Sequence, residues 1–528
     1  MRLGRRHFVK KSLGAAGAAA VFSNLFARRA SADAYGDIIP DPAGVLDLPE
    51  GFSYVVLQEA GDAMDDGYVV PGRPDGMACF AGADEGTWVL MRNHEVSAND
   101  DANGAYGSGE APPEAYDPDG FGGVSRIVID AQDGSVVSSN LVLTGTVRNC
   151  AGGPSPWGWL SCEESVETDH GYVFACPEGA ASVVQAEPII GFGRFNHEAA
   201  AVDPDTLVTY LTEDRGDGCL YRHVPNSLDT PFEGRLQALR IVDEDAFNTA
   251  PLGTVGQNFE VAWVDIDDPN PSGDTLRFTA RQDGAASFTR GEGLWFFEGQ
   301  VYFSCTNGGP VGLGQIFRLV DDGDTGTLEL VAVSDGEGTL DFPDNITVAP
   351  WGELFICEDG GSDQYIRILT PDGTLCDFAR NALSGSELAG ACFSPDGSAL
   401  FVNIQGDGLT LMITGPFPEI PSGGDESTGG DESSGGDDET GSDDPTGDAE
   451  TGDGNSASGT TAPGTSTETA GADTDGESGT DGSSAGGSSG GGGCSVDGNN
   501  AAGVAVLAGL AITKATSGED TDDESISS

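Results

Sequence analysis

Short apolar runs separated by turn residues recur six times between residues 74 and 405. In each case a polar or glycine cluster leads into a short run of apolar or small residues. A turn rich in Pro, Gly or Asp follows, and a second apolar run then ends in polar residues. Apolar runs bounded by turn residues are typical of strands. Each segment therefore predicts a β-hairpin; the six are "PDGMACFAGADEGTWVLMRNHE", "NCAGGPSPWGWLSCEES", "NHEAAAVDPDTLVTYLTED", "GEGLWFFEGQVYFSCTN", "PDNITVAPWGELFICED" and "AGACFSPDGSALFVNIQ".

The spacing of these hairpins predicts the fold class. Successive segments lie roughly 50 residues apart, or near twice that where other strands intervene, which is a period typical of propeller blades. Long patterns of helical period are missing from this part of the chain, which argues against a helical repeat. We predict an all-β fold over residues 35–420, a β-propeller with six blades.

Polar residues gather where these hairpins begin and end. The start of the first strand and the end of the second lie at the same end of an antiparallel hairpin. If these are the innermost strands of each blade, that end faces the central channel. The residues predicted to converge there are ten acids, one Asn and one Cys: Asp75, Asn149, Glu198, Glu292, Asp344, Glu95, Cys162, Glu163, Glu213, Asp214, Glu358 and Asp359.

Such a ring of acids would repel itself strongly unless cations were bound. Carboxylate and amide oxygens suit calcium, whereas a thiolate among carboxylates suits a transition metal. Cys162, in "PWGWLSCEES", is the predicted thiolate ligand. An alternative is a disulfide from Cys162 to Cys150 or Cys176. His94 and His197 are either ligands or structural histidines.

The cysteine count leaves room for a ligand thiolate. Nine cysteines lie between residues 79 and 392, and an odd number cannot pair completely within the domain.

The charge balance excludes some partners. The 528 residues include 87 acids and only 23 Lys plus Arg, and Arg provides all positive charge between residues 35 and 420. This argues against binding to nucleic acid or to an anionic membrane. The surplus acids either keep the protein soluble in a salty medium or hold cations.

The first 34 residues have the features of an export signal. Arg5 and Arg6 precede a modest apolar stretch, which ends at Ala-x-Ala sites near Ala34. Residues 1–34 are similar to a twin-arginine signal peptide, so the twin-arginine export machinery is a predicted partner. An ordinary secretory signal is the alternative.

The last hundred residues predict a tail without a core. Residues 421–492 are almost entirely Gly, Ser, Thr, Asp and Glu, which predicts a disordered linker. Residues 493–528 contain a short apolar segment and an acidic end. Cys494 before that segment resembles the sorting tails of some bacterial surface proteins, which suggests cell-surface attachment. Those tails usually end in a basic cluster, whereas this one ends in "SGEDTDDESISS".

Several motifs together resemble those of the PhoX-type alkaline phosphatases: "RNCAGGPSPWGWLSCEE", "GRFNHEAAAVDP", "LTED", "FTRGEGLWF", "FICEDG" and "CFSPDGSALFVNIQ". The resemblance spans about residues 46–416. It implies twin-arginine export, a six-bladed propeller, and iron and calcium ions (Fe3+ and Ca2+) at the channel that hydrolyse phosphomonoesters.

The resemblance also implies roles for individual residues. Cys162, Glu198 and Glu292 match iron-binding positions, and Arg290 matches a phosphate-contacting arginine. Arg290, Cys162 and Glu292 would then be catalytic. The candidates for calcium or bridging ligands are Glu95, Glu213, Asp214, Glu358, Asp359 and Glu387. The family's phosphate site is also associated with a lysine, whereas lysine here occurs only at Lys10, Lys11 and Lys514.

These observations favour an exported, monomeric, metal-dependent phosphatase that acts on a small phosphate ester in the periplasm, at the cell surface or outside the cell. Phosphate-loop and nucleophile-elbow motifs are missing from the sequence, which removes two other hydrolase plans. Two alternatives remain: a non-catalytic, calcium-stabilised binding module, and another propeller hydrolase such as a lactonase or phosphodiesterase. Cys162 discriminates between the phosphatase and the calcium-stabilised binding module, because calcium prefers oxygen ligands and a purely structural calcium site has no use for a thiolate.

Overall fold

In the part of the chain that the structure describes, regular structure is almost entirely β-strand. The computed structural model describes residues 35–107, 109–361 and 363–420, all within the compact unit Met1–Thr428. The predictions made for residues 1–34, 421–492 and 493–528 lie outside the described residues. No helix in the described part of the chain is long and apolar enough to cross a membrane.

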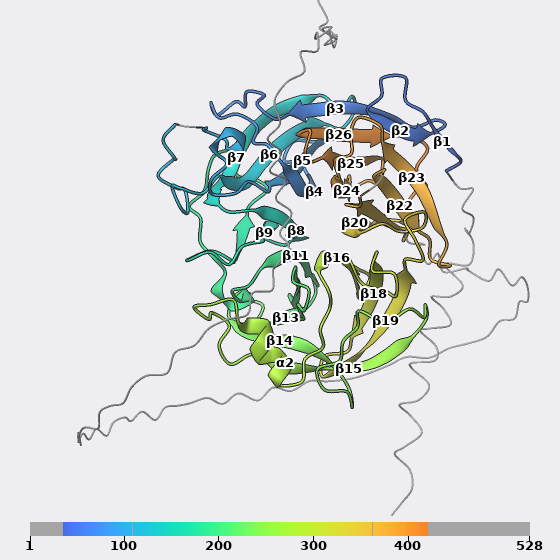
Figure 1. The fold of residues 1–528 in the computed structure, drawn as a ribbon. Helices are drawn as coiled ribbons and strands as arrows, with labels where there is room; N and C mark the ends of the chain where they lie inside the picture. Colours follow the sequence, from blue (N-terminus) through green and yellow to red (C-terminus); the bar gives the residue numbers. More distant parts are fainter. Residues whose placement is uncertain (1–34, 108, 362, 421–528) are drawn as a thin grey trace, which may run out of the picture. The chain divides into compact units, whose positions relative to one another are not determined.

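The strands form five antiparallel sheets (Figure 1). The first sheet comprises β4 (Pro74–Ala81), β5 (Thr87–His94), β6 (Gly122–Asp130) and β7 (Val136–Thr146). The second comprises β8 (Asn149–Ser155), β9 (Gly158–Glu163) and β10 (Val173–Cys176). The third, of nine strands, comprises β11 (His197–Val202), β12 (Thr209–Glu213), β13 (Leu220–Pro225), β14 (Gly234–Ile241), β15 (Asn258–Asp265), β19 (Thr325–Val333), β18 (Gln315–Asp321), β17 (Gln300–Cys305) and β16 (Gly291–Phe297).

The remaining two sheets combine both ends of the described chain. One comprises β20 (Pro343–Val348), β21 (Leu354–Glu358), β22 (Tyr365–Leu369), β23 (Leu375–Asn381), β2 (Leu46–Pro49) and β1 (Ile38–Ile39). The other comprises β24 (Leu388–Phe393), β25 (Ala399–Ile404), β26 (Leu409–Thr414) and β3 (Ser53–Glu59). The short helices are η1 (Asp101–Asn103), η2 (Ile190–Phe192) and α2 (Leu276–Gln282).

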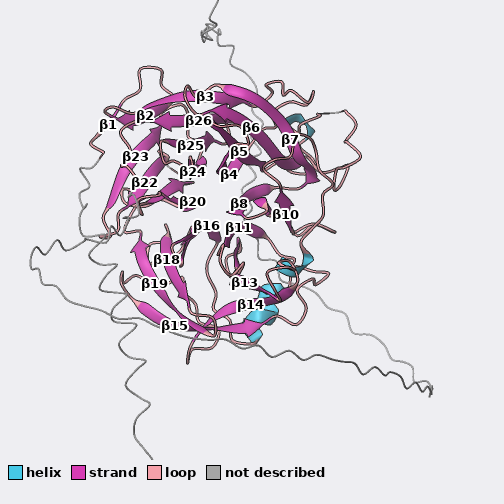
Figure 2. Cartoon of the chain, turned by 180° about the vertical axis from the view of Figure 1, so that it is seen from behind, coloured by secondary structure: helices cyan, strands magenta, loops and turns pink. Residues whose placement is uncertain are grey.

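All six predicted hairpins are present, as β4–β5, β8–β9, β11–β12, β16–β17, β20–β21 and β24–β25. Their first strands face a common centre in Figure 1, and Figure 2 shows the same arrangement from behind. All six contribute to the lining of one cavity of only about 20 Å³. The fold is therefore all-β and propeller-like, as predicted, with a tightly packed axis.

The six hairpins repeat two local features. Near the start of each first strand the pairing register shifts, as between Pro74 and Met77 in β4. In addition, the residue after the second strand donates its N–H to the carbonyl of the residue just before the first strand. The six bonds measure 2.8–3.3 Å and run Glu95→Arg73, Glu164→Arg148, Asp214→Asn196, Thr306→Arg290, Asp359→Phe342 and Gln405→Glu387. An irregular register re-aims side chains, and this one turns the second residue of each first strand toward the axis.

Pairing between distant parts of the chain closes the arrangement. Strand β3 pairs with β26, so residues near 55 lie beside residues near 411. Arg92 reinforces this closure from β5, because its guanidinium donates to Gln58, Ser125 and Thr410 although the side chain is completely buried. Burial lowers the pKa of Arg92 to about 9.

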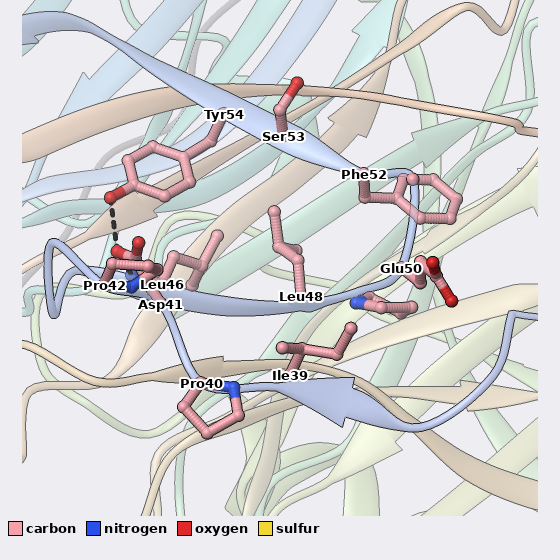
Figure 3. A pocket seen from close by; sticks show the side chains of 12 residues that line it. Ile39, Pro40, Asp41, Pro42, Leu46, Leu48, Glu50, Phe52, Ser53 and Tyr54 are labelled. Carbon is pink, nitrogen blue, oxygen red and sulfur yellow. Dashed lines mark hydrogen bonds between the residues drawn. The ribbon is translucent and has the colours of Figure 1, made fainter.

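The N-terminal strands also form a hollow, and Figure 3 shows the side chains that line it. Its volume is about 500 Å³, and β1, β2, β3 and their connections line it. Asp41 organises this segment, since its carboxylate accepts hydrogen bonds from the Tyr54 hydroxyl at 2.6 Å and from the Val45 N–H at 2.9 Å. The hollow lacks a cluster of acids or cysteines, so the candidate chemistry lies elsewhere.

Candidate metal centre

A ring of buried acids and one thiol surrounds the axis. The second residue of each of the first five inner strands is a metal-ligating type: Asp75, Cys150, Glu198, Glu292 and Asp344. All five side chains are buried. The equivalent residue of β24 is Ala389, but Glu387 lies just before that strand. The register shifts described above therefore present a ring of ligand atoms at one end of the axis.

A second tier of acids follows the second strands of the hairpins. Glu95, Glu164, Asp214 and Asp359 each come directly after a strand, at the position that donates the repeated backbone hydrogen bond. The two tiers approach each other closely. Within the described residues, ligand atoms lie within 4.8 Å of one another in four groups: Asp75–Glu95–Cys150, Cys150–Glu164–Glu198, Glu198–Glu292–Asp344 and Asp344–Asp359–Glu387.

These groups overlap, because Cys150, Glu198 and Asp344 each belong to two of them. The result is a continuous chain of eight carboxylates and one thiol. A buried acid cluster of this density is unfavourable when all its members are charged, since desolvation and mutual repulsion both act against ionisation.

The pKa values of the ring acids reflect this unfavourable burial and repulsion. Burial, followed by repulsion from neighbouring carboxylates, holds the pKa of Asp75, Glu198 and Glu292 well above the ordinary value. Burial also raises the pKa of Asp344 to about 6. Both carboxylate oxygens of Glu198 and Oδ1 of Asp75 are buried and have no hydrogen-bond partner. Buried polar atoms normally have partners, so these oxygens fit coordination by cations.

Cys150 places a soft donor inside this chain. Its Sγ lies 3.9 Å from Oδ2 of Asp75, and burial followed by the charges of Asp75 and Glu198 raises the pKa of the thiol. A bound cation would reverse this balance, since coordination deprotonates a thiol outright. The donor set of one sulfur and many oxygens suits a transition metal beside calcium.

The structure corrects the prediction for Cys162. The residues of β9 alternate between two sides, so Leu160 and Cys162 share one face and Ser161 the other. Cys162 is fully buried in an apolar cluster with Val173, Phe195 and Leu211. Burial alone raises the pKa of its thiol, without any carboxylate contribution. Cys162 therefore does not reach the groups of ligand atoms, and Cys150 is the thiol that does.

The disulfide alternative is also absent here. All nine cysteines of the described residues carry free thiols, including Cys150, Cys162 and Cys176.

Three acids predicted for the ring are likewise held elsewhere. Glu163 accepts a hydrogen bond from the Gly171 N–H and pairs with His170. Glu213 accepts hydrogen bonds from the Tyr221 hydroxyl and the Cys219 N–H and pairs with Arg277 at 3.3 Å. Glu358 pairs with Nε of Arg367 at 2.9 Å. Each is the last residue of its strand, and alternation turns it away from the axis. The next residues, Asp214 and Asp359, adjoin the ring of ligand atoms instead.

The other predicted ligands do come together. Glu95, Glu198, Glu292, Asp359 and Glu387 all belong to the four groups. Asp214 adjoins them through Arg290, whose Nε donates to Asp214 at 2.9 Å and whose Nη2 donates to Glu292 at 2.6 Å. His94 and His197 belong to none of the groups. Ring nitrogens of His94 contact the Gly72 carbonyl and the Ser125 hydroxyl, which is a structural arrangement.

Sequence reasoning missed two members, Cys150 and Glu164, and it placed Asp75 and Asp344 in the ring without naming them as metal ligands. The signal that identifies them is the repeat itself. When the first strands are aligned on the small residue that follows in four of them ("DG", "CA", "EA" and "EG"), Cys150 occupies the same column as Asp75, Glu198 and Glu292. Asn149, which was predicted for this column, lies one position too early.

Comparison with known proteins identifies the family. The model of the family described as alkaline phosphatase PhoX matches residues 33–142 and 135–408, which is well over half of the chain. This chain belongs to the PhoX alkaline phosphatase family. The predicted family is therefore confirmed, as is the prediction of a phosphatase enzyme.

A solved structure supports the fold of this PhoX family member. Pseudomonas fluorescens PhoX, in complex with vanadate, a transition-state analogue, is 18% identical and superposes with a TM-score of 0.58. The match covers 72% of this chain and 97% of that one. A putative gluconolactonase is 13% identical with a TM-score of 0.33, over 72% of this chain and 98% of that one. No curated protein matches the chain.

Proposed function

We propose that this chain is an exported, metal-dependent phosphomonoesterase whose iron and calcium ions lie in the ring around the axis. The carrying observation is the chain of overlapping ligand groups, in which Glu198 has two buried oxygens without partners and Cys150 offers a thiol. Family membership supplies the reaction class.

The proposed architecture is a six-bladed propeller. The six inner hairpins and their six equivalent backbone hydrogen bonds support this count. The described strands form five hydrogen-bonded sheets and not six because β15 pairs with both β14 and β19, which joins two blades into the nine-stranded sheet. The three-stranded sheet β8–β10 is then the smallest blade.

The donor set divides the proposed metals. Iron (Fe3+) would bind near Cys150, Glu198 and Glu292, because a thiolate favours a transition metal over calcium. Calcium (Ca2+) would bind the all-oxygen groups toward Asp344, Asp359 and Glu387. When bound, such cations supply Lewis acidity and neutralise the charge of the phosphoryl group.

Arg290 is the proposed phosphate-contacting residue. It lies at the edge of the ring, its side chain is 35% exposed, and it pairs with Asp214 and Glu292. Burial lowers the pKa of Arg290, but the charges of Glu292 and Asp214 raise it by more than burial lowers it. The pKa is therefore raised overall, and the guanidinium stays charged. A planar guanidinium can donate two parallel hydrogen bonds to phosphate oxygens and so hold the phosphoryl group in one orientation.

The competing functions predict a different ring. A calcium-stabilised binding module, or a lactonase that relies on calcium, has no use for a buried thiol among carboxylates. Cys150 therefore favours the phosphatase. The proposed substrate is a small phosphate ester. Three further proposals rest on the sequence features. These are export through the twin-arginine machinery to the periplasm, the cell surface or the medium, a monomeric state, and surface attachment through the tail.

A pair of cysteine variants tests this proposal. Cys150→Ser should lose iron and most phosphomonoesterase activity, and after chelator treatment its melting temperature should lie within a few degrees of that of chelator-treated wild type. Cys162→Ser is the matched control, because it buries a hydroxyl in an apolar cluster. It should lower the free energy of unfolding by about 1–3 kcal/mol and leave metal content unchanged. Full iron content and normal turnover in Cys150→Ser would contradict the proposed metal centre.

A further inference from the structure

A second arginine occupies the same position in the repeat as Arg290. Arg148 lies immediately before β8, as Arg290 lies immediately before β16. Both have left-handed backbone conformations, with φ of 53° and 49°. Such conformations are costly for residues other than glycine and persist where the surroundings enforce them. Here the Arg148 N–H donates to the Val96 carbonyl at 3.0 Å, and the Arg148 carbonyl accepts from Glu164 at 2.8 Å. The backbone is therefore fixed at the edge of the ring.

The side chain of Arg148 also mirrors that of Arg290. Arg148 pairs with Glu95 (Nε to Oε1, 3.5 Å) and with Glu164. These two acids belong to the two groups that share Cys150. Arg290 likewise pairs with two acids at the ring, Asp214 and Glu292. The two guanidiniums therefore border the part of the ring that contains Cys150 and Glu198 from two different blades.

Arg148 remains accessible to a ligand. Its side chain is 38% exposed, close to the 35% of Arg290, whereas the carboxylate of Glu164 is 9% exposed. A guanidinium has five N–H donors, so two ion pairs leave donors for a further acceptor. If cations bind Glu95 and Glu164, those carboxylates share their charge with the cations and Arg148 gains still more freedom to bind an anion.

We propose that Arg148 is a second phosphate-contacting residue, which binds the phosphoryl group together with Arg290. This inference rests on the proposed phosphatase function and deepens it. A phosphomonoester carries two negative charges and three terminal oxygens, whereas a diester carries one charge and two such oxygens. Two arginines on different blades therefore favour the monoester, because each can pair with its own oxygens.

The repeat provides a matched control for this residue. Arg73 lies immediately before β4, at the same repeat position, and also has a left-handed φ of 47°. Its ion pair is with Asp100, at 3.7 Å, outside the four ligand groups. Arg73→Gln therefore removes an arginine from the same local structure without removing a guanidinium paired with ring acids.

The experiment compares metal-loaded wild type, Arg148→Gln, Arg148→Lys and Arg73→Gln as full chains. The Kd of inorganic phosphate is measured by titration calorimetry, and bound metal is measured by elemental analysis. Values of kcat/KM are measured for two substrates, a phenyl phosphate monoester and a phenyl phosphate diester. Arg148→Gln should weaken phosphate binding by about 10- to 100-fold, lower the preference for the monoester, and keep its metals. Arg148→Lys should fall between, since lysine keeps the charge but not the planar donor pair.

Each result has one meaning. Unchanged phosphate affinity and ester preference in Arg148→Gln, with an active wild type, would overturn the role of Arg148 and leave the phosphatase function standing. Loss of metals in Arg148→Gln would also overturn it, because Arg148 would then only hold the ligands in place. An equal effect in Arg73→Gln would show a nonspecific charge effect and overturn it too. A metal-loaded wild type that neither binds phosphate nor hydrolyses either ester would overturn both proposals.

Discussion

The ring acids face opposite demands from folding and from the proposed metal binding. Folding transfers Asp75, Glu198, Glu292 and Asp344 out of water and close to like charges, which raises the pKa of each. Cation binding requires the same groups to be ionised. The protein without metals should therefore be destabilised in the very conditions in which the ring binds metals best.

This conflict predicts an unusual pH dependence for chelator-treated protein. Each of these acids has a higher pKa in the folded state than in the unfolded state, so the folded state binds more protons. The contribution of these groups to the free energy of unfolding is then fully present below about pH 4, where unfolded carboxyls are protonated. This contribution falls as the pH rises. For Asp344 the fall ends near its folded pKa of about 6, and for the others it continues higher. Melting temperatures of chelator-treated protein should drop between pH 5 and pH 8, and those of metal-loaded protein should not.

A single substitution should separate the two demands. Glu198→Gln removes one charge from the ring, at a carboxylate whose two buried oxygens have no hydrogen-bond partner. In chelator-treated protein at pH 8 this variant should melt higher than wild type, because the uncharged amide is cheaper to bury than a carboxylate among like charges. In metal-loaded protein it should bind less metal and melt lower. A lower melting temperature in both states would contradict the electrostatic account of the ring.

At the level of the strand, the ring depends on small residues next to its ligands. Gly76 follows Asp75 in β4, and a Cβ atom at this position would lie 2.6 Å from the Cα of Ala151 in β8. Similar close approaches occur at Gly293 and Gly390. The inner strands can therefore converge tightly enough to bring their ligands within reach of one another only because these side chains are missing.

Gly76→Ala tests this packing. The added methyl group should push β4 and β8 apart, lower the free energy of unfolding by about 1–3 kcal/mol, and reduce metal content, since Asp75 and Cys150 both move. Gly179→Ala is the control: its Cβ would meet nothing within 4 Å, so stability should be unchanged or slightly higher. Melting temperature and metal analysis on both variants check the prediction. Full metal content in a destabilised Gly76→Ala would show that the ligands tolerate the displacement.

The same strands show what the sequence could and could not predict. The six hairpins were predictable because apolar runs and turn residues recur locally, and local patterns decide strand pairing within a hairpin. The identity of the ligands depends on alternation at the strand ends, where a shift of one residue reverses the direction of a side chain. The apolar runs predict Glu213 and Glu358 in addition to Asp214 and Asp359, and Cys162 in place of Cys150, because they do not reveal register shifts near the strand starts.

At the scale of the whole domain, the two ends of the described chain are joined. Strand β3 completes the sheet of β24–β26, and the residues beyond β26 add an aromatic contact. Phe417 lies 4.9 Å from Phe52 and 5.4 Å from Phe393, measured between ring centroids, and also packs near Trp351 and Phe378. The folded unit therefore includes residues after the last strand, which ends at Thr414.

This contact sets where the chain can be shortened. A chain that ends at Ile420 keeps Phe417 and should match the full chain in melting temperature and in turnover per bound iron, because the composition of residues 421–492 cannot form an apolar core. A chain that ends at Pro416 loses the aromatic contact and should unfold with about 1–3 kcal/mol less free energy. Phe417→Ala in the chain ending at Ile420 should reproduce that loss, which would assign it to the ring and not to chain length. If instead the chain ending at Ile420 lost stability or turnover, residues after 420 would have to pack on the domain, and the prediction of a dispensable tail would be wrong.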